Sequence, residues 1–315
     1  MGWHEFALES EALRGNPLGD PAARPLWVWA PDGQGRALPA RFLLHGMTGQ
    51  GRSWFNVSPF AKNIPELIDE LGLDAIVVLV DGWTALGGSQ WIDSPAIGNY
   101  GRYLCEDVVE FVDAHFSVSR RALAGRSSGG IGAATWTMLR PDLFAGFASH
   151  AGDALFEVMY SAEFSAAAQA LRNLYDGSVD RFWADLRSGR PVFENRTDPL
   201  LQNVCAAAAA YSPGELPFRI DTGELVPAVW ERWLEWDPVR LAAKHPEALR
   251  AAKGIWIDAG RHDEYHLDLG ATAFANAVSA AGAEDVHFEL HEGTHRGTNW
   301  RLPLSLAFLA ERLAA

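Results

Sequence analysis

A short Gly- and Ser-rich segment near the middle of the chain has residue types suited to nucleophilic catalysis. Gly125-Arg-Ser-Ser-Gly129 fits the pattern G-x-S-x-G, with Ser127 at its centre. The apolar run 122–124 before it is typical of the end of a buried strand, and the small residues of 130–139 favour a helix after it. A strand, a sharp turn with Ser at its tip and a helix form a nucleophile elbow, whose strained turn needs glycine on both sides. We therefore predict Ser127 as a nucleophile.

Ser128 is the alternative nucleophile in the same segment. A frame centred on it would need Gly at position 126, where the chain has Arg. The pattern by itself also fits an ordinary Gly-rich turn between a strand and a helix, because Gly and Ser are common residues. Other parts of the chain have to decide between these interpretations.

Two later loops carry the other groups that a serine nucleophile needs, which are a base for its proton and an acid that orients the base. The segment Asp258-Ala-Gly-Arg-His-Asp263 ends one expected strand, and Glu292-Gly-Thr-His295 ends the next. The order Ser, acid, His is the one found in α/β-hydrolases. The loops therefore favour the catalytic interpretation of the Gly-rich segment.

Position along each loop selects the individual residues. Asp263 is the predicted acid, because it lies past the strand end and can reach a neighbouring loop. Asp258 is still inside the strand and is expected to be structural, and Glu264 is the alternative acid. His295 lies on the turn and is the predicted base, whereas His291 belongs to the strand.

Ester hydrolysis by Ser also needs donors for the negatively charged oxygen of the tetrahedral intermediate. One predicted donor is the backbone N–H of Ser128, directly after the nucleophile. The other is the backbone N–H of Met47, which follows His45-Gly46 at the end of an early strand. Both donors are main-chain atoms, so the Met47 side chain is expected to matter little.

A histidine pair in the acid loop raises the alternative of a metal site. His262 and His266 are four residues apart, as in a zinc-binding helix. The chain lacks the Glu that follows the first His in H-E-x-x-H and acts as its base. We therefore predict no metal and no cofactor.

The rest of the chain alternates expected strands and helices, which predicts an α/β-hydrolase fold. The strands are expected at 26–30, 40–44, 75–80, 122–124, 144–149, 255–259 and 286–290, and the helices at 58–71, 102–115, 130–139 and 303–313. Residues 1–23 are expected to be irregular. Alternation predicts a mostly parallel sheet with helices on both faces and a ligand site beyond the carboxyl ends of the strands. All the predicted groups follow strand ends.

The strand pattern stops between 153 and 252. Four helices are expected there, at 166–174, 179–186, 200–211 and 225–236. We predict a single α/β-hydrolase domain over 1–315, in which 153–252 is a mostly helical, cap-like insertion over the strand ends. The chain has 13 Trp residues, and some of them are candidates for the pocket wall: Trp54, Trp83, Trp230 and Trp233.

Composition limits the classes of partner and compartment. The net charge is −14 and no basic run occurs, which argues against binding to nucleic acid or to an anionic membrane. The N-terminus has no signal-peptide pattern, and no apolar run approaches the length that spans a membrane. Cys105 and Cys205 are expected as two unpaired thiols. We expect a cytoplasmic protein acting on a small-molecule ester, with the oligomeric state, a homo-oligomer included, left open.

With these residues identified, the chain resembles the putative-esterase branch of the α/β-hydrolases, which includes esterase D (S-formylglutathione hydrolase), enterochelin esterases and mycolyltransferases. The resemblance rests on His45-Gly46, Gly125–Gly130, Asp258–Asp263 and Glu292–His295, and on the segments 15–20 and 236–239. It implies Ser127 as nucleophile, Asp263 as acid and His295 as base, with Met47 and Ser128 as oxyanion donors.

Two departures from esterase D bear on specificity. The elbow reads Arg-Ser-Ser where esterase D typically has His-Ser-Met, and the insertion looks longer. Both argue against specificity for a glutathione thioester. The mycolyltransferases are secreted and resemble this chain in fold only.

The sequence therefore predicts a serine carboxylic-ester hydrolase that works through an acyl-enzyme. An acyltransferase or a thioesterase would use the same three residues, and both stay open as alternatives. A non-catalytic binding protein on this fold would be expected to have lost one of the three, and none is missing.

Overall fold

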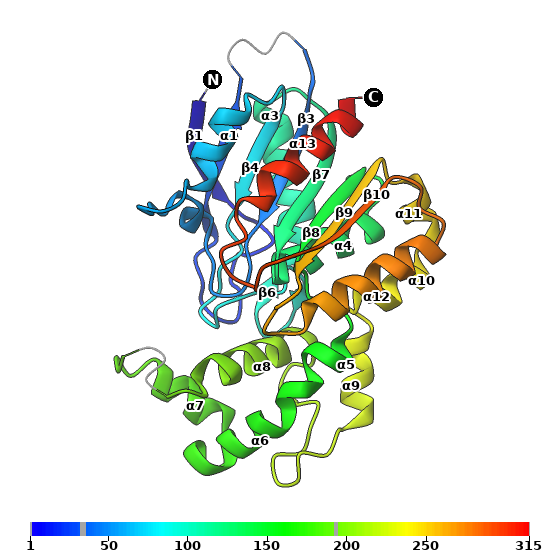
Figure 1. The fold of residues 1–315 in the computed structure, drawn as a ribbon. Coiled ribbons are helices and arrows are strands. Elements are labelled where there is room, and N and C mark those ends of the chain that lie inside the picture. Colours follow the sequence, from blue (N-terminus) through cyan, green and yellow to red (C-terminus); the bar gives the residue numbers. More distant parts are fainter. Residues whose placement is uncertain (1, 32–35, 192–194, 315) are drawn as a thin grey trace.

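An eight-stranded sheet forms the centre of the molecule (Figure 1). The computed structural model describes residues 2–31, 36–191 and 195–314. In spatial order the strands are β1 (Gly2–Glu9), β2 (Ala23–Ala30), β4 (Ile76–Val80), β3 (Leu38–Leu44), β7 (Val118–Arg126), β8 (Gly146–His150), β9 (Gly254–Gly260) and β10 (Val286–His291). The pairs β1–β2 and β2–β4 are antiparallel and all others are parallel. This arrangement confirms the predicted α/β-hydrolase fold.

The central strands are apolar because helices cover both faces of the sheet. Every residue of β3, β4, β8 and β9 is buried. Parallel strands of this kind have apolar residues on both faces instead of alternating polar and apolar ones. The strand β7 lies in the middle of the sheet, between β3 and β8, so its carboxyl end is flanked by two neighbouring strand ends.

The expectation of an irregular N-terminus was wrong. Residues 2–9 form the edge strand β1, which pairs antiparallel with β2 from Gly2 opposite Ala30 to Glu9 opposite Ala23. Most of its side chains are exposed or half-buried, so the segment lacks the apolar alternation by which strands are recognised. Its pairing depends on β2, which no local pattern reveals.

Helix α1 (Ile64–Leu71) begins six residues later than expected from Ser58. Asn63 caps it: its side chain accepts from the backbone N–H of Glu66, and the Glu66 side chain accepts from the N–H of Asn63. This reciprocal capping box fixes the start of the helix. The predicted helix at 102–115 is observed as α2 (Tyr100–Arg102), a π-helical segment (Tyr103–Val108) and α3 (Val109–His115).

The helices form two layers on the sheet. One face is covered by α3, α4 (Ser128–Leu139), α10 (Pro238–Lys244), α11 (Pro246–Ala251) and α12 (Leu267–Ala280). The other is covered by α1 and α13 (Arg301–Ala314), with the short 3-10 helix Gly51–Phe55 at its side. Each layer closes its own apolar core.

The region predicted as an insertion, 153–252, divides into two parts. The first consists of α5 (Phe156–Met159), α6 (Ser161–Tyr175), α7 (Val179–Leu186), α8 (Asp198–Tyr211) and α9 (Pro227–Leu234), and we call these the cap helices. They lie beyond the carboxyl ends of the strands (Figure 1). The second part, α10 and α11, returns to the sheet and packs against α4.

Asp237 connects the two parts. Its fully buried carboxylate accepts hydrogen bonds from the N–H groups of Leu155 (3.2 Å), Phe156 (3.3 Å) and Val239 (3.0 Å). It therefore caps α10 and at the same time holds the start of α5. The cap core is aromatic, with the rings of Tyr160, Tyr211 and Trp233 in mutual contact.

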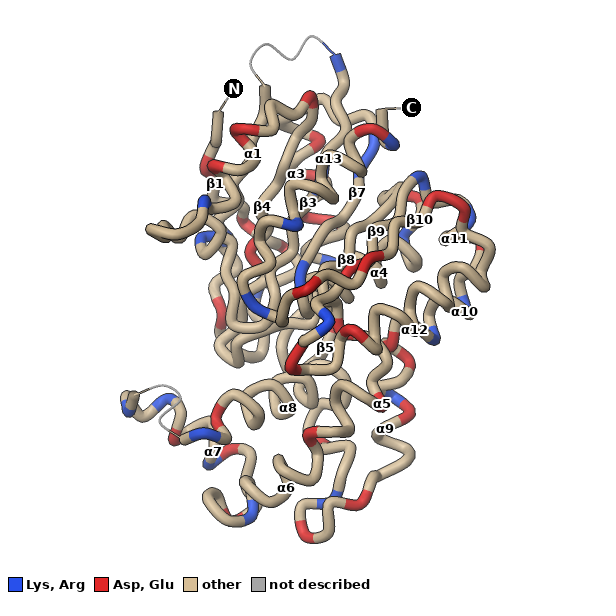
Figure 2. Tube along the Cα trace, in the orientation of Figure 1, with Lys and Arg blue, Asp and Glu red and all other residues tan. Residues whose placement is uncertain are grey.

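The distribution of charged and apolar residues along the described chain agrees with what the composition indicates. Lys and Arg are interspersed with Asp and Glu along the described segments, and no described helix or strand is basic throughout (Figure 2). Of the helices that the structure describes, none is both long enough and apolar enough to cross a membrane. Cys105 and Cys205 are both buried and unpaired.

Candidate active site

The backbone at the elbow is strained and depends on the glycines on either side of Ser127. Ser127 lies between the end of β7 and the start of α4 with φ 56° and ψ −128°, a conformation that non-glycine residues rarely adopt. A Cβ at Gly125 would lie 2.2 Å from the carbonyl oxygen of Gly129, and a Cβ at Gly129 would lie 2.0 Å from that of Leu44. Both glycines are therefore required for the turn that lifts Ser127 above the sheet.

The structure brings Ser127, His295 and Asp263 together. The Ser127 Oγ lies 3.2 Å from Nε2 of His295, and Nδ1 of His295 lies 2.9 Å from Oδ2 of Asp263. The Asp263 carboxylate is fully buried, and its Oδ1 accepts a hydrogen bond from the N–H of Tyr265 at 2.9 Å. Because a carboxylate only accepts, Nδ1 must carry the proton, which leaves Nε2 free to accept from the serine hydroxyl.

Glu264, the alternative acid, has a different position. Its Oε2 accepts a hydrogen bond from the backbone N–H of His295 at 2.8 Å, so it holds the histidine loop and not the imidazole. The ring of Tyr265 meets the imidazole of His295 edge-on, with centroids 4.9 Å apart. Glu264, expected only as an alternative acid, and Tyr265, which the sequence did not single out, thus both hold His295 in position.

Asp258 belongs to a different buried polar cluster, formed by side chains of β8, β9 and α13. Its Oδ1 is 2.8 Å from Nδ1 of His150, and its Oδ2 accepts from Nε of Arg301 and Nε1 of Trp256, each at 2.8 Å. Burial alone would raise the pKa of this carboxyl, but His150, Trp256 and Arg301 together lower it to about 2. Asp258 therefore holds buried side chains together, as its position within β9 predicted.

The loop after β3 approaches Ser127 closely. A Cβ at Gly46 would lie 3.0 Å from Cβ of Ser127, and the described residues offer no acceptor to the backbone N–H of Met47. His45 holds this loop: its Nε2 accepts from the N–H of Gly82 at 2.9 Å, and its Nδ1 lies 2.9 Å from the carbonyl oxygen of Gly46. Burial lowers the pKa of His45, which favours the neutral ring that these contacts need.

Truncating the Met47 side chain tests whether the main chain of this loop is the active part. Met47→Ala keeps the backbone N–H, so kcat for an ester is expected to fall by less than about tenfold, whereas loss of an oxyanion donor costs roughly 10²–10³. Gly46→Ala, whose new Cβ would press on Ser127, is the contrasting variant and is expected to reach that larger loss. The measurement is kcat from steady-state kinetics on both variants. An equal loss of kcat in the two would contradict the interpretation that the main chain of this loop is the active part.

A cavity of about 430 Å³ opens above Ser127 and His295. Besides these two, it is lined by Gly46, Met47, Thr48, Arg126, Met159, Pro199, Gln202, Asn203, Tyr265 and Arg296. Met159 comes from α5, and Pro199, Gln202 and Asn203 come from α8, so cap helices contribute one wall. The Trp residues considered for this wall do not line it; Trp230 and Trp233 lie in the cap core instead.

Two arginines line this cavity near Ser127 and His295. Arg126 precedes Ser127 and donates to Oδ1 of Asn299 at 3.3 Å, and Arg296 follows His295. Within the described part of the chain, no carboxylate lies at ion-pair distance from either guanidinium. Burial lowers the pKa of Arg126, and the charge of Arg296 lowers it further.

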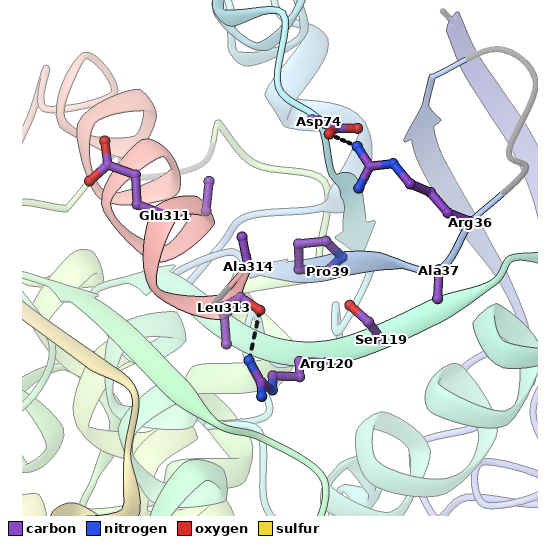
Figure 3. A pocket seen from close by; sticks show the side chains of 10 residues that line it. Arg36, Ala37, Pro39, Asp74, Ser119, Arg120, Glu311, Leu313 and Ala314 are labelled. Carbon is purple, nitrogen blue, oxygen red and sulfur yellow. Dashed lines mark hydrogen bonds and ion pairs between the residues drawn. The ribbon is translucent and has the colours of Figure 1, made fainter.

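A second hollow, of about 570 Å³, lies at the opposite end of the sheet (Figure 3). It is lined by residues around the starts of β3 and β7 and the end of α13, including Pro39, Ser119 and Leu313. Arg36 pairs with Asp74 there, and Arg120 donates to the carbonyl oxygen of Leu313 at 3.1 Å. In parallel sheets ligands bind at the carboxyl ends of the strands, so position favours the cavity above Ser127.

The histidine pair of the acid loop is not on one helix. His262 lies in a turn, and His266 precedes the first residue of α12 with φ 59°. The Nε2 of His262 lies 3.7 Å from Oε2 of Glu292. The described residues contain no group of three or more His, Cys, Asp or Glu side chains that could hold a metal ion.

Comparison with solved structures shows where this fold occurs. A ferulic acid esterase is 17% identical with a TM-score of 0.62, and 98% of each chain is covered. A fluorophosphonate-binding serine hydrolase of Staphylococcus aureus gives the same identity, TM-score and coverage. An S-formylglutathione hydrolase of Agrobacterium tumefaciens is 17% identical with a TM-score of 0.61, over 99% of this chain and 95% of that one. At this level of identity the likeness establishes the fold.

Sequence comparison supplies the family. No curated protein matches the chain in sequence. The model of the family described as putative esterase matches residues 23–310, which run from β2 into α13 and include every residue of the site. The chain therefore belongs to the putative esterase family, and the predicted class of enzyme, a serine esterase, is confirmed at this level.

Proposed function

We propose that the protein hydrolyses carboxylic esters through an acyl-enzyme on Ser127, with His295 as general base and acid and Asp263 as the residue that orients it. The observation that carries the proposal is the continuous hydrogen-bonded chain of these three side chains, at 3.2 Å and 2.9 Å, of which Ser127 and His295 line the cavity. Distances of this kind between nucleophile, base and acid are what acyl transfer to serine needs.

In the first half of the reaction, the Ser127 oxygen bonds to the ester carbonyl carbon while its proton passes to Nε2 of His295. The carbonyl oxygen takes up the electron pair and accepts from the N–H groups of Met47 and Ser128. As this oxygen re-forms its double bond, the bond to the alcohol oxygen breaks, and the His295 proton passes to the leaving alcohol. Asp263 stabilises the imidazolium between the two transfers.

In the second half, water replaces the alcohol. His295 takes a proton from the water, whose oxygen bonds to the acyl carbon and displaces Ser127. His295 then returns the proton to the Ser127 oxygen, and the carboxylic acid leaves. The alcohol departs on the side of His295 and Arg296, because the imidazole has to reach the alcohol oxygen.

An acyl-enzyme can also react with other acceptors, which distinguishes the two alternative functions. An acyltransferase would pass the acyl group to an alcohol, and a thioesterase would prefer a sulfur leaving group. The structural neighbours include an S-formylglutathione hydrolase and ferulic acid esterases, so both sulfur and oxygen leaving groups occur on this fold. We favour an oxygen ester, because the elbow of this chain differs from the esterase D pattern.

The test is a rapid-mixing experiment with p-nitrophenyl acetate. We expect a burst of nitrophenol close to one equivalent per active site, and intact-protein mass spectrometry of an acid-quenched sample should show the added acetyl group. Glycerol then measures partition, and we expect free acetate to dominate over glyceryl acetate. Dominant glyceryl acetate would identify a transferase. Turnover without any acylated protein would contradict the covalent mechanism.

A further inference from the structure

Asp153 places a buried carboxyl beside the nucleophile. It lies in the loop directly after β8, the strand next to β7, and its side chain has almost no exposure. The backbone on either side is held in strained positions, with φ 43° at Ala151 and φ 55° at Leu155. The N–H of Ala151 donates to the carbonyl oxygen of Asp258 at 2.7 Å. The carboxyl is therefore fixed in place.

Within the described chain, only one of the two oxygens of this carboxyl has a hydrogen-bond partner. Its Oδ2 accepts a hydrogen bond from the hydroxyl of Tyr160 at 2.8 Å, whereas its Oδ1 has no partner among the described residues. Burial raises the pKa of Asp153 to about 6, and the nearby Ser127 hydroxyl and His295 imidazole act against this rise. An unpartnered buried oxygen costs stability, so a group held in this state needs another reason to be there.

The surroundings of Asp153 are short of positive charge. The other charged side chains that act on its carboxyl come from the acidic loop and from α6: Asp263 and Glu163. No Lys or Arg of the described chain forms an ion pair with Asp153. Behind it, the Tyr160 hydroxyl accepts from Nε2 of Gln90 at 3.2 Å, and Oε1 of Gln90 is itself buried without a partner. This environment favours a cationic donor.

The cavity lies next to this environment, because Ser127, which lines the cavity, also acts on the Asp153 carboxyl. Ser127 and Met159 line it, and Asn203, also in its wall, donates from Nδ2 to Oε2 of Glu163 at 2.9 Å. Arg126 and Arg296 also line the cavity, and Arg296 follows His295, whose imidazole has to reach the leaving alcohol oxygen. The acyl group stays bonded to Ser127, and Ser127 is the cavity residue that acts on the Asp153 carboxyl.

We propose that the Asp153 carboxylate, held by Tyr160, binds a protonated amine on the carbon next to the scissile carbonyl, which makes aminoacyl esters the preferred acyl class. This inference rests on the proposed function. The ammonium would donate to the unpartnered Oδ1, and no covalent step changes. A charge-assisted hydrogen bond of this kind corresponds to about 10- to 100-fold in kcat/KM.

The test compares three benzyl esters whose acyl groups have nearly the same shape: glycine (ammonium), propionic acid (methyl) and glycolic acid (hydroxyl). Release of benzyl alcohol is measured at pH 7, with Ser127→Ala as the blank for spontaneous hydrolysis. The wild type is expected to prefer the glycine ester over the propionate ester by about 10- to 100-fold. In Asp153→Asn, which keeps the shape and removes the charge, the preference should fall at least about tenfold.

Two further variants separate a change in substrate preference from a loss of folded protein. Asp180→Asn removes the same charge from an exposed site on α7 and should keep the wild-type preference. Tyr160→Phe keeps the carboxylate and removes its donor, and an intermediate preference is expected. Equal rates of the wild type on glycine and propionate esters would overturn the proposal. So would an equal preference for glycolate, or an equal slowing of all three esters in Asp153→Asn. Unimpaired turnover by Ser127→Ala would instead refute the proposed function.

Discussion

Ser127→Ala is expected to lower kcat for ester hydrolysis by about 10⁴- to 10⁶-fold, because it removes the oxygen that we propose attacks the ester carbonyl. The Ser127 Oγ is the atom that contacts Nε2 of His295. Without it, the imidazole has no nucleophile to activate, and only the oxyanion donors and substrate binding remain. The measurement is kcat with p-nitrophenyl acetate, together with labelling by a fluorophosphonate, which should disappear in the variant.

The neighbouring serine is the matched control for this result. Ser128→Ala also removes one hydroxyl from the elbow but keeps the backbone N–H, so a loss of less than about tenfold is expected. Circular dichroism and thermal unfolding should show both variants folded. A large loss in Ser128→Ala with activity retained in Ser127→Ala would move the nucleophile to the second serine.

Asp263→Asn and Asp258→Asn are expected to have different effects, the first on catalysis and the second on stability. Both replace a buried carboxylate, one in the loop after β9 and the other in β9 itself. Asp263→Asn is expected to lower kcat by about 10⁴-fold, because an amide can no longer hold His295 in the tautomer that accepts from Ser127. Its effect on stability should be the smaller of the two, since the amide oxygen can still accept from Tyr265. The readouts are kcat and the free energy of unfolding in urea.

Asp258→Asn is expected to show the opposite profile. Removing this charge leaves Arg301 and His150 without their buried partner, which costs roughly 3–5 kcal/mol of unfolding free energy. The folded fraction should retain kcat within about tenfold, because Asp258 does not touch His295. Similar losses of kcat in both variants would contradict the assignment of the acid.

The pH dependence of this stability difference follows from the pKa of Asp258. Its folded-state pKa of about 2 lies below the unfolded value of 3.8, so the ionised carboxylate stabilises the folded state at pH values above about 4. This contribution is lost as pH falls from 4 toward 2. The deficit of Asp258→Asn relative to the wild type should therefore shrink over that range.

The sequence by itself determined the parts of this protein whose physics is local. The elbow could be predicted, because only glycine at 125 and 129 permits the strained conformation of Ser127. The strands β3 and β4 could be predicted, because burial on both faces makes them continuously apolar. The order Ser, acid, His along the chain identified the loops of Ser127, Asp263 and His295, whose side chains meet in the structure.

Other features depend on where distant segments meet. Asp258, Asp263 and Glu264 lie within seven positions of one another, and spacing could rank them but not assign their partners. In the structure, Asp258 contacts His150, and Glu264 accepts from the backbone N–H of His295. Of the three, only Asp263 contacts the His295 imidazole. Strand β1 also depends on a distant segment, because an edge strand has little apolar signal of its own.

Asp153 is the clearest case of a feature that only the tertiary structure decided. Its local sequence, His150-Ala-Gly-Asp-Ala154, is compatible with any polar turn. The exclusion of water and the unpartnered oxygen beside Ser127 arise only when the β8 loop, α5 and the elbow pack together. Local backbone preferences are encoded residue by residue, whereas desolvation of a charge is a property of everything around it, and for this reason it first becomes visible in the folded chain.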